Sequence, residues 1–228
     1  MRGQLLSNDE TRAREILETK NAAAPLGGEA KRLIDITFAS CSLAFFLPLF
    51  GLIALTIKLS DGGPIFYRHW RVGHARQSFE CLKFRTMVMD GEEVLRHHLA
   101  VSNDASVEWN ETRKLKRDPR VTAVGAVLRK LSLDELPQLI NILRGDMSIV
   151  GPRPIVSDEV EMYGPHAELY FKARPGLTGL WQVSGRNDKS YNERVQLDCA
   201  YVLSWSLGTD LRIIARTIPA VLTSRGSY

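Results

Sequence analysis

Two adjacent acidic residues, Asp134 and Glu135, interrupt a stretch with an apolar helical pattern, in the run SLDELPQL. Because successive side chains on a helix point about 100° apart, the two carboxylates cannot work as a facing pair. We therefore expect different tasks for them, with one attacking as a nucleophile and the other holding a metal ion. Taken alone, a run of this kind would also fit a helix cap at Asp134.

A second group of chemically capable residues is basic. Lys83 and Arg85 stand two residues apart in the run KFRTM, so a strand there would place both on one face. A strand that faces phosphate groups needs this arrangement, although a solvated edge strand would show it too. Attack on an already anionic phosphorus requires such cations, and arginine adds planar forks suited to phosphate.

The elements that must position these residues follow from the periodicity of the apolar residues. Two runs, 65–72 and 78–87, are typical of the strands of a β-hairpin. Two amphipathic helices are predicted at 121–129 and 133–143. Asp134 then lies near the N-terminus of the second helix, where negative charge is favoured.

Residues 36–57 form the most apolar stretch of the chain and carry no formal charge. As a straight helix they would extend about 33 Å, enough to cross the hydrocarbon of a bilayer. Pro48 lies in the middle of the stretch and removes a backbone donor, so a kink or break is predicted there.

Basic residues flank both ends of this stretch, and the positive-inside tendency places both flanks in the cytoplasm. The flanking residues are Lys31, Arg32, Lys58, Arg68 and Arg71. We therefore predict a helix that enters the membrane, breaks near Pro48 and returns to the same face. A spanning helix and a buried core helix are the alternatives, whereas the length of the stretch argues against a secretory signal.

Charge and cysteine content exclude several classes of protein. The chain has 30 Lys and Arg against 26 Asp and Glu, a formal net charge of +4, so nucleic acid is not an expected partner. Three scattered cysteines, Cys41, Cys81 and Cys199, indicate a reducing compartment without a disulfide framework. Neither they nor the histidines show the spacing of a zinc site.

The runs SLDELPQL, LRGDMSIVGPRP, KFRTM and RPGLTGLWQVSGRN occur in an order that resembles the bacterial sugar transferase family across roughly residues 30–225. Members of this family are monotopic phosphoglycosyl transferases, which move a sugar 1-phosphate from a nucleotide diphosphate sugar to a polyprenyl phosphate. The resemblance implies a Pro-broken hairpin that dips into one leaflet. Family members commonly have Ser before that proline, where this chain has Leu47.

The resemblance also assigns roles to individual residues. It implies Asp134 as the nucleophile, which takes the sugar phosphate and releases UMP, and Glu135 as the ligand of Mg²⁺. Further positions match basic and acidic residues of the family's active site: Arg129 and Arg153 near the phosphate, and Lys83, Arg186, Asp198 and Asp210 in substrate binding or support. We add Arg85 to the expected substrate-binding residues because it would share a strand face with Lys83. Arg153 also fits a structural arginine that satisfies loop carbonyls, and Trp181 fits packing better than stacking on uracil.

The resulting prediction is a mixed α/β fold, mainly helical with a small β-hairpin. We predict a flexible extension at 1–28, a re-entrant membrane helix-hairpin at 29–60 and a cytosolic catalytic domain at 61–228. The apolar stripe at 201–222 fits either the membrane interface or the domain core. The enzyme would lie on the cytoplasmic face of the bacterial inner membrane, among its lipids, with both termini in the cytoplasm.

The expected partners are a UDP-hexose and undecaprenyl phosphate, and the expected product starts an exopolysaccharide. The stretch MDGEE and the long 90–120 segment resemble the exopolysaccharide branch, including rhizobial galactose-phosphate transferases, so galactose or glucose is the favoured sugar. An N-acetylhexosamine is the alternative substrate. A membrane-anchored assembly or regulatory component without turnover is the alternative function, and a homodimer stays open.

Overall fold

The computed structural model describes residues 24–112, 115–185 and 190–222. Helices dominate it, and two small sheets supply the remaining regular structure. The predicted mixed, mainly helical fold with a small hairpin is thereby confirmed. The predicted extension at 1–28 falls largely outside the described residues.

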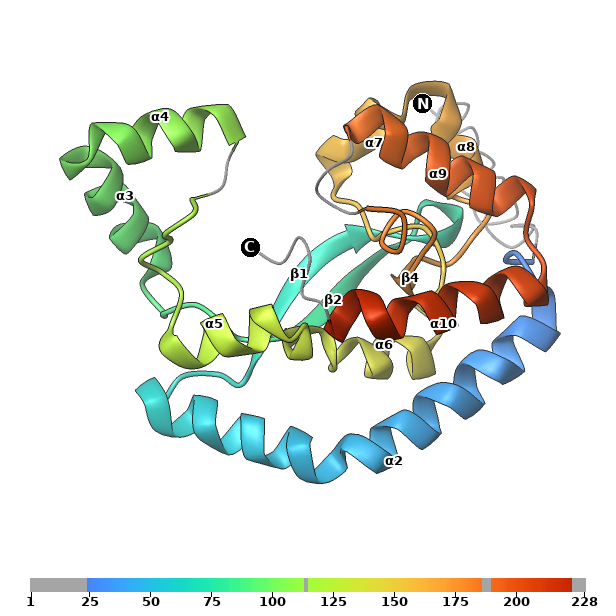
Figure 1. Ribbon diagram of the computed structural model, residues 1–228, viewed down its shortest axis with the longest axis horizontal. Helices are drawn as coiled ribbons and strands as arrows, with labels where there is room; N and C mark the ends of the chain where they lie inside the picture. The colour runs from blue at the N-terminus through green and yellow to red at the C-terminus, as the bar shows by residue number, and fades with distance from the viewer. Residues whose placement is uncertain (1–23, 113–114, 186–189, 223–228) are drawn as a thin grey trace, which may run out of the picture.

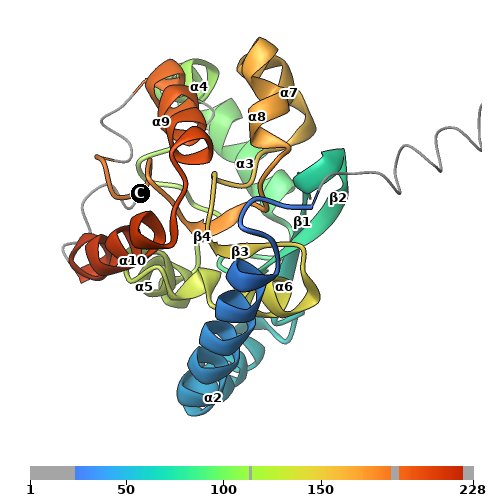
Figure 2. The same cartoon turned by 90° about the vertical axis from the view of Figure 1, so that its right-hand side faces the viewer.

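The longest element is α2 (Gly28–Asp61), which lies along one edge of the molecule in both ribbon views (Figures 1 and 2). The helix is not interrupted at Pro48. Its ribbon is bent instead (Figure 1), as expected when a proline removes one N–H group and crowds the preceding turn. The predicted break is therefore a bend, and the helix ends at Gly62, which adopts the left-handed conformation with φ 72°.

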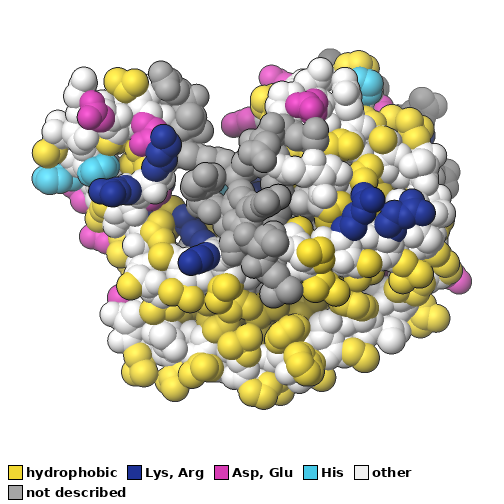
Figure 3. Space-filling view, in the orientation of Figure 1, with side chains coloured by type: hydrophobic (Ala, Val, Ile, Leu, Met, Phe, Trp, Pro, Cys, Tyr) yellow, Lys and Arg dark blue, Asp and Glu magenta, His cyan; other side chains and the backbone are white. Residues whose placement is uncertain are grey.

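Apolar side chains of α2 face outward. Only 11% of its most apolar window is buried, so the alternative of a buried core helix is wrong. Space-filling shows hydrophobic side chains spread over the edge formed by α2 and toward α10 (Figure 3). Its large exposed hydrophobic residues include Leu33, Phe45, Leu47, Leu52, Leu55 and Leu59. An apolar surface of this extent marks a membrane or partner contact.

The predicted hairpin is formed by β1 (Phe66–Val72) and β2 (Ser78–Phe84), joined by a 3₁₀ turn (His74–Arg76). The strands are antiparallel, with Tyr67 opposite Lys83 and Val72 opposite Ser78. Near α2, Phe66 and Phe84 stack with their ring centroids 5.8 Å apart, and Phe50 of α2 packs on Phe84 at 4.7 Å. The hairpin is thus attached to α2 by aromatic packing.

After the hairpin the chain forms two helices, α3 (Gly91–Val101) and α4 (Asn103–Thr112), which stand apart from the remaining helices (Figure 1). The structure differs from prediction farther along the chain. The helix predicted at 133–143 is split into a 3₁₀ turn, η2 (Leu133–Glu135), and α6 (Gln138–Arg144). Pro137 explains the split, because it lacks the N–H that a continuous helix would use there.

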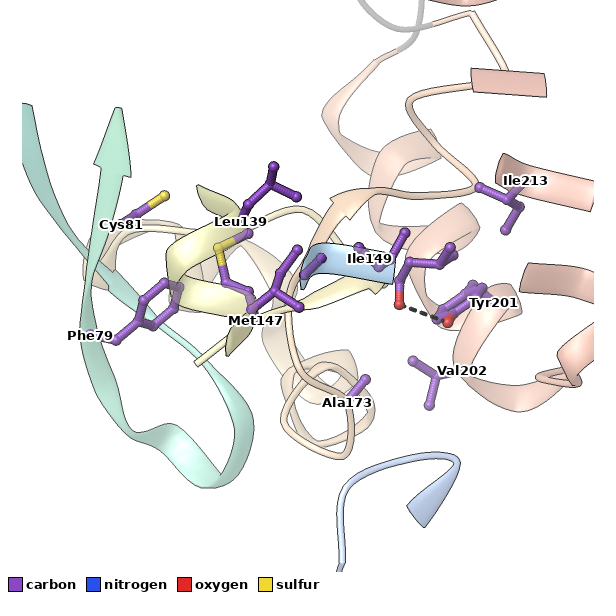
Figure 4. Close-up of a cluster of buried hydrophobic side chains, with 12 residues drawn as sticks. Phe79, Cys81, Leu139, Met147, Ile149, Ala173, Tyr201, Val202 and Ile213 are labelled. Atoms are coloured by element: carbon purple, nitrogen blue, oxygen red, sulfur yellow. Dashed lines mark hydrogen bonds between the residues drawn. The ribbon is translucent and has the colours of Figure 1, made fainter. Parts of the chain in front are cut away.

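The remaining elements enclose the core. They are α5 (Ala123–Lys130), β3 (Ser148–Val150), α7 (Ser157–Tyr163), a 3₁₀ turn (Gly164–His166), α8 (Ala167–Tyr170), β4 (Gly176–Thr178), α9 (Tyr191–Leu203) and α10 (Leu207–Leu222). Figure 4 shows buried side chains from the hairpin, α6, β3 and the last two helices, among them Phe79, Met147, Ile149, Tyr201 and Ile213. The 201–222 stripe packs on this core through Ile213, while Leu211 and Ile218 stay exposed.

Candidate active site

The two acidic residues and Lys83 meet at one point, although they are distant in sequence. Lys83 Nζ lies 2.6 Å from Glu135 Oε1 and 3.5 Å from Asp134 Oδ2. Lys83 reaches them from the end of β2, while both acids lie in η2. One ammonium group therefore holds two neighbouring carboxylates.

Local backbone geometry aims the two carboxylates toward β2. Ser132, just before η2, adopts the left-handed conformation with φ 57°, which turns the chain sharply after α5. The 3₁₀ turn then places Asp134 and Glu135 in a tighter coil than an α-helix would allow. The predicted position of Asp134 at an α-helix N-terminus is therefore wrong, and its role as a simple helix cap has no helix to serve.

Asn141 fixes the distance between α6 and β2. Its Oδ1 accepts from the backbone N–H of Leu82 at 2.9 Å, and its Nδ2 donates to the carbonyl of Glu80 at 2.7 Å. Asn141 is fully buried, so both bonds are shielded from water. This amide locks η2 and α6 against the strand that carries Lys83.

Burial is the strongest influence on the Asp134 carboxyl and raises its pKa above the usual range. The positive charges of Lys83 and Arg129 oppose this effect, while the charge of Glu135 adds to it. Lys83 in turn has a raised pKa, because the two carboxylates outweigh the cost of its burial. Lys83 and Arg129 thus lower the pKa of Asp134 against the effect of its burial.

Arg129 approaches the pair from the last turn of α5. Its Nε donates to the hydroxyl of Thr86 at 2.9 Å, which orients the guanidinium group beside β2. Thr122 caps the start of α5 by accepting from Gly125 N at 2.9 Å. Thr86 therefore fixes the side chain of Arg129, and Thr122 caps the start of the helix that carries it.

A small cleft opens next to Glu135. It is lined by Arg71, Cys81, Lys83, Glu135, Gln138, Arg153, Pro154, Gly176, Leu177 and Gln182. Three cationic side chains, Arg71, Lys83 and Arg153, thus share a cleft with one carboxylate. Such a concentration of positive charge fits the binding of phosphate groups.

Trp181 and Asp198 hold Arg153 in place at the cleft. Its guanidinium stacks on the Trp181 ring at 5.5 Å, and its backbone hydrogen-bonds to the carboxylate of Asp198. Asp198 is buried and also accepts from the hydroxyl of Tyr163 at 2.7 Å. Burial raises the pKa of Asp198 to about 6. Asp198 is thereby placed as a support of Arg153 and does not line the cleft.

Two glycines allow the chain to bring Arg153 this close. The short strands β3 and β4 run parallel, and Gly151 N–H donates to the carbonyl of Thr178 at 2.9 Å. A Cβ atom on Gly176 would overlap the backbone of Gly151, and one on Gly151 would overlap the carbonyl of Arg174. Only glycine fits at this crossing.

The structure does not bring every predicted site residue together. Arg85 follows the end of β2 and pairs with Asp61 at the end of α2, so it does not join Lys83 in the cleft. Asp210 binds Lys31 Nζ at 2.5 Å and lines a different cavity, between α2 and α10. Arg186 lies outside the described residues.

Arg71 was not predicted as a site residue, yet it lines the cleft. Burial lowers the pKa of its guanidinium, and the positive charge of Arg153 contributes to the same effect. Strand alternation could have indicated Arg71, because it lies on the same face of β1 as Tyr67, the residue opposite Lys83. The pattern alone does not show which residues of the two strands stand opposite each other, so this prediction required the register of the hairpin.

The carboxylates also fit a partial magnesium site. Among the described residues, no group of three or more His, Cys, Asp or Glu side chains is arranged to hold a metal ion. Mg²⁺ is commonly held by one or two carboxylates together with substrate phosphates. Glu135 lines a cleft suited to phosphate and is a carboxylate of the kind that such a site uses.

Comparison with known proteins identifies the class. A family model described as bacterial sugar transferase matches residues 27–224, and the chain belongs to this family, as the sequence motifs predicted. It is 60% identical over 213 residues to the exopolysaccharide production protein ExoY of Rhizobium meliloti (strain 1021), covering 93% of this chain and 94% of that protein.

Two further relatives have names that state a reaction. The undecaprenyl-phosphate galactose phosphotransferase of Salmonella typhimurium (strain LT2) is 52% identical over 87% of this chain and 41% of its own length. The UDP-glucose:undecaprenyl-phosphate glucose-1-phosphate transferase of Caulobacter vibrioides is 40% identical over 87% of this chain and 72% of its own length.

Proposed function

We propose that this protein transfers a hexose 1-phosphate from a UDP-sugar to undecaprenyl phosphate and releases UMP. The observation that carries the proposal is the placement of Asp134 and Glu135 beside Lys83, at the edge of a cleft with two more cations. Phosphoryl transfer relies on positioning and on cations that offset negative charge, and this site offers both. The named reactions of two relatives support the same chemistry.

In the first half-reaction, a carboxylate oxygen of Asp134 attacks the phosphorus that bears the sugar. The bond from this phosphorus to the bridging oxygen breaks, and UMP leaves with the electron pair. The nucleophile must be ionised, which is why the charges of Lys83 and Arg129 matter at a buried carboxyl. Arg71 and Arg153 line the cleft where the diphosphate would bind.

In the second half-reaction, an oxygen of undecaprenyl phosphate attacks the same phosphorus. The bond to Asp134 breaks, and the carboxylate is regenerated. Dividing the transfer into two displacements predicts ping-pong kinetics. It also allows the soluble donor and the membrane-bound acceptor to use one site in turn.

We propose Mg²⁺ as the cofactor, with Glu135 as its principal protein ligand. A bound Mg²⁺ would offset the charge of the donor phosphates. Lys83 would hold Glu135 and Asp134 in place before the donor arrives, since it contacts both carboxylates.

We propose that α2 is a re-entrant membrane helix and that both its ends lie at the cytoplasmic face. The two ends are attached to the same domain: Arg32 donates to the carbonyls of Ile142 and Leu143 in α6, and Asp61 pairs with Arg85 beside β2. A spanning helix would place its ends on opposite sides of the bilayer. The bend near the middle and the exposed apolar side chains suit a helix that dips into one leaflet.

Cysteine labelling tests this topology. In a Cys41→Ala background, a cysteine introduced at Glu29 lies in the first turn of α2, and one introduced at Glu92 lies in α3, beyond the other end of α2. We expect a membrane-impermeant thiol reagent to leave both cysteines unlabelled when it is added from the periplasmic side. It should label both once the inner membrane is permeabilised and the reagent reaches the cytoplasm. Labelling of either position from the periplasm would reject the re-entrant arrangement.

Galactose or glucose is the proposed sugar, and the proposed pathway step is the start of exopolysaccharide assembly. The names of three relatives support this choice. The test is UMP release by the purified protein with Mg²⁺, undecaprenyl phosphate and a panel of UDP-sugars. UDP-galactose or UDP-glucose should give the highest rate, and a preference for a UDP-N-acetylhexosamine would replace the sugar but keep the reaction.

The alternative is a membrane-anchored component of polysaccharide assembly that lacks turnover. The contact of Lys83 with an intact Asp134 and Glu135 pair argues against it. Absence of UMP release with every UDP-sugar would favour this second function.

A further inference from the structure

The face of the hairpin that carries Lys83 also carries two aromatic rings. Tyr67 lies directly opposite Lys83 in the strand register, and His69 lies opposite Cys81. Residues directly opposite each other in an antiparallel pair project from the same face. Since Lys83 and Cys81 line the cleft, Tyr67 and His69 extend the same face by one strand.

These two rings form a contiguous and accessible surface. Their centroids are 5.9 Å apart at an interplanar angle of 48°, and Tyr67 is 51% exposed. Toward the other end of the hairpin the same face turns into the core, where Phe79 packs beside Met147 (Figure 4). An exposed ring pair next to a phosphate-binding cleft therefore exists only at the end nearer Lys83.

His69 is held as a neutral ring with a defined tautomer. The distance from Arg71 Nη2 to His69 Nδ1 is 3.0 Å, and because arginine has no acceptor, Nδ1 must accept this bond. Burial lowers the pKa of His69, as do the charges of Arg71 and Lys83. The neutral ring then carries its proton on Nε2, a donor of the kind that a pyrimidine carbonyl accepts.

The geometry of displacement decides which part of the donor reaches these rings. In phosphoryl transfer the attacking and leaving oxygens lie roughly in line with the phosphorus. Asp134 attacks from η2, and Lys83 on β2 lies beside it, so the leaving nucleotide extends away from η2 across β2 toward β1. The oxygen that carries the sugar is an equatorial substituent of the phosphorus, so the sugar points away from the line between Asp134 and the leaving nucleotide. The neighbouring strand is about 5 Å farther on, within reach of a nucleotide.

We propose that Tyr67 and His69 form the nucleobase-binding wall of the donor site, with the uracil ring stacked on Tyr67 and positioned by the edge of His69. This inference rests on the proposed use of a UDP-sugar. It assigns a specificity role to residues outside the acidic pair and the arginines. Flat aromatic surfaces bind bases by stacking, and a single such contact commonly changes affinity about tenfold or more.

The hairpin itself supplies a matched control. Trp70 is 63% exposed but lies on the opposite face, in register with Glu80. A general effect of removing an exposed ring from β1 would appear at both positions. An effect of the donor site would appear at Tyr67 alone.

The experiment measures equilibrium binding of UMP and of ribose 5-phosphate to the full-length protein in detergent micelles. We expect Tyr67→Ala to weaken UMP binding about tenfold, while Tyr67→Phe and Trp70→Ala bind UMP like the wild type. Ribose 5-phosphate, which lacks the base, should bind the wild type and Tyr67→Ala equally. Wild-type affinity for UMP in Tyr67→Ala, equal weakening of ribose 5-phosphate, or no UMP binding by the wild type would each overturn the proposal.

Mass measurement on the same preparations separates this inference from the proposed function. If wild-type protein forms a covalent hexose-phosphate adduct but Tyr67→Ala binds UMP normally, the base wall is wrong and the proposed reaction stands. If UMP binds through Tyr67 but no adduct forms under any condition, the proposed reaction fails while the nucleotide site stands.

Discussion

Lys83 Nζ lies 2.6 Å from Glu135 Oε1, and this ion pair joins a β-strand to a 3₁₀ turn 52 positions later in the chain. The same ammonium group reaches Asp134 at 3.5 Å. Without a cation there, two adjacent and largely buried carboxylates would repel each other and favour protonation. The ion pair thus keeps the proposed nucleophile ready for attack.

Replacing Lys83 by Met should move the pH dependence of the reaction. Because Lys83 lowers the pKa of Asp134 against the effect of burial, its loss raises that pKa further. UMP release requires ionised Asp134, so the acid limb of the rate profile should shift to higher pH, and the rate at pH 7 should fall by about a hundredfold. Initial rates of UMP release across pH test this, with Lys130→Met as the control for a lost positive charge. An unchanged acid limb would show that Lys83 does not act on the nucleophile.

Asp198→Asn should alter how stability depends on pH. Burial raises the pKa of Asp198 to about 6 in the folded protein, above the ordinary value of an aspartate carboxyl. Folding therefore favours the protonated form, and wild-type stability should fall as pH rises from about 4 to about 6 and stay level above that. Asn cannot titrate, so the difference in free energy of unfolding between the two proteins should change by about 3 kcal/mol across this window.

Denaturant midpoints at several pH values give this difference. Asp158→Asn, on an exposed position of α7, is the control and should track the wild type. A constant difference between wild type and Asp198→Asn from pH 4 to pH 7 would mean that the buried carboxyl stays charged throughout.

Arg32→Met should loosen the attachment of α2 to the catalytic domain. Arg32 donates to the carbonyls of Ile142 and Leu143 at 2.5 Å and 2.8 Å, groups that end α6. Loss of these charge-assisted bonds should lower the free energy of unfolding by about 2 kcal/mol. Chemical unfolding in detergent measures it, and Arg212→Met, on an exposed position of α10, should change little. Equal effects of the two substitutions would remove any special role for Arg32.

Two Gly→Ala substitutions should have opposite effects. At Gly176 a methyl group would collide with the backbone of Gly151, so we expect a loss of about 3 kcal/mol and displacement of Arg153. At Gly51, in α2, nothing lies within 4 Å of the added atom, and Ala should stabilise the helix by about 0.5 kcal/mol or more. Thermal unfolding compares them, and a well-folded, active Gly176→Ala would refute the close crossing of β3 and β4.

Features with local signals were predicted from sequence. Alternation identified the hairpin, and apolar composition identified the helix that contains Pro48, because both patterns repeat over many residues. The pairing of β3 with β4 was not predicted, since strands of three residues have no usable periodicity. Their contact depends on Gly151 and Gly176, whose close approach joins distant parts of the chain.

The site was predicted only in part, because some of its residues stand in local motifs and others are placed by long-range contacts. Motifs indicated Asp134, Glu135 and Lys83, and the structure brings these three together. Strand alternation predicted that Arg85 would share a face with Lys83. However, β2 ends at Phe84, and Arg85 forms an ion pair with Asp61. Partner choice of this kind depends on tertiary structure, which the pattern of one strand does not contain.

Intact mass spectrometry of the protein with UDP-galactose or UDP-glucose and Mg²⁺, without lipid acceptor, tests the central claim most directly. The account predicts a mass increase of one hexose phosphate on the wild type, its loss when undecaprenyl phosphate is added, and no adduct on Asp134→Asn. Product formation without any adduct under trapping conditions, or an adduct that persists in Asp134→Asn, would contradict it.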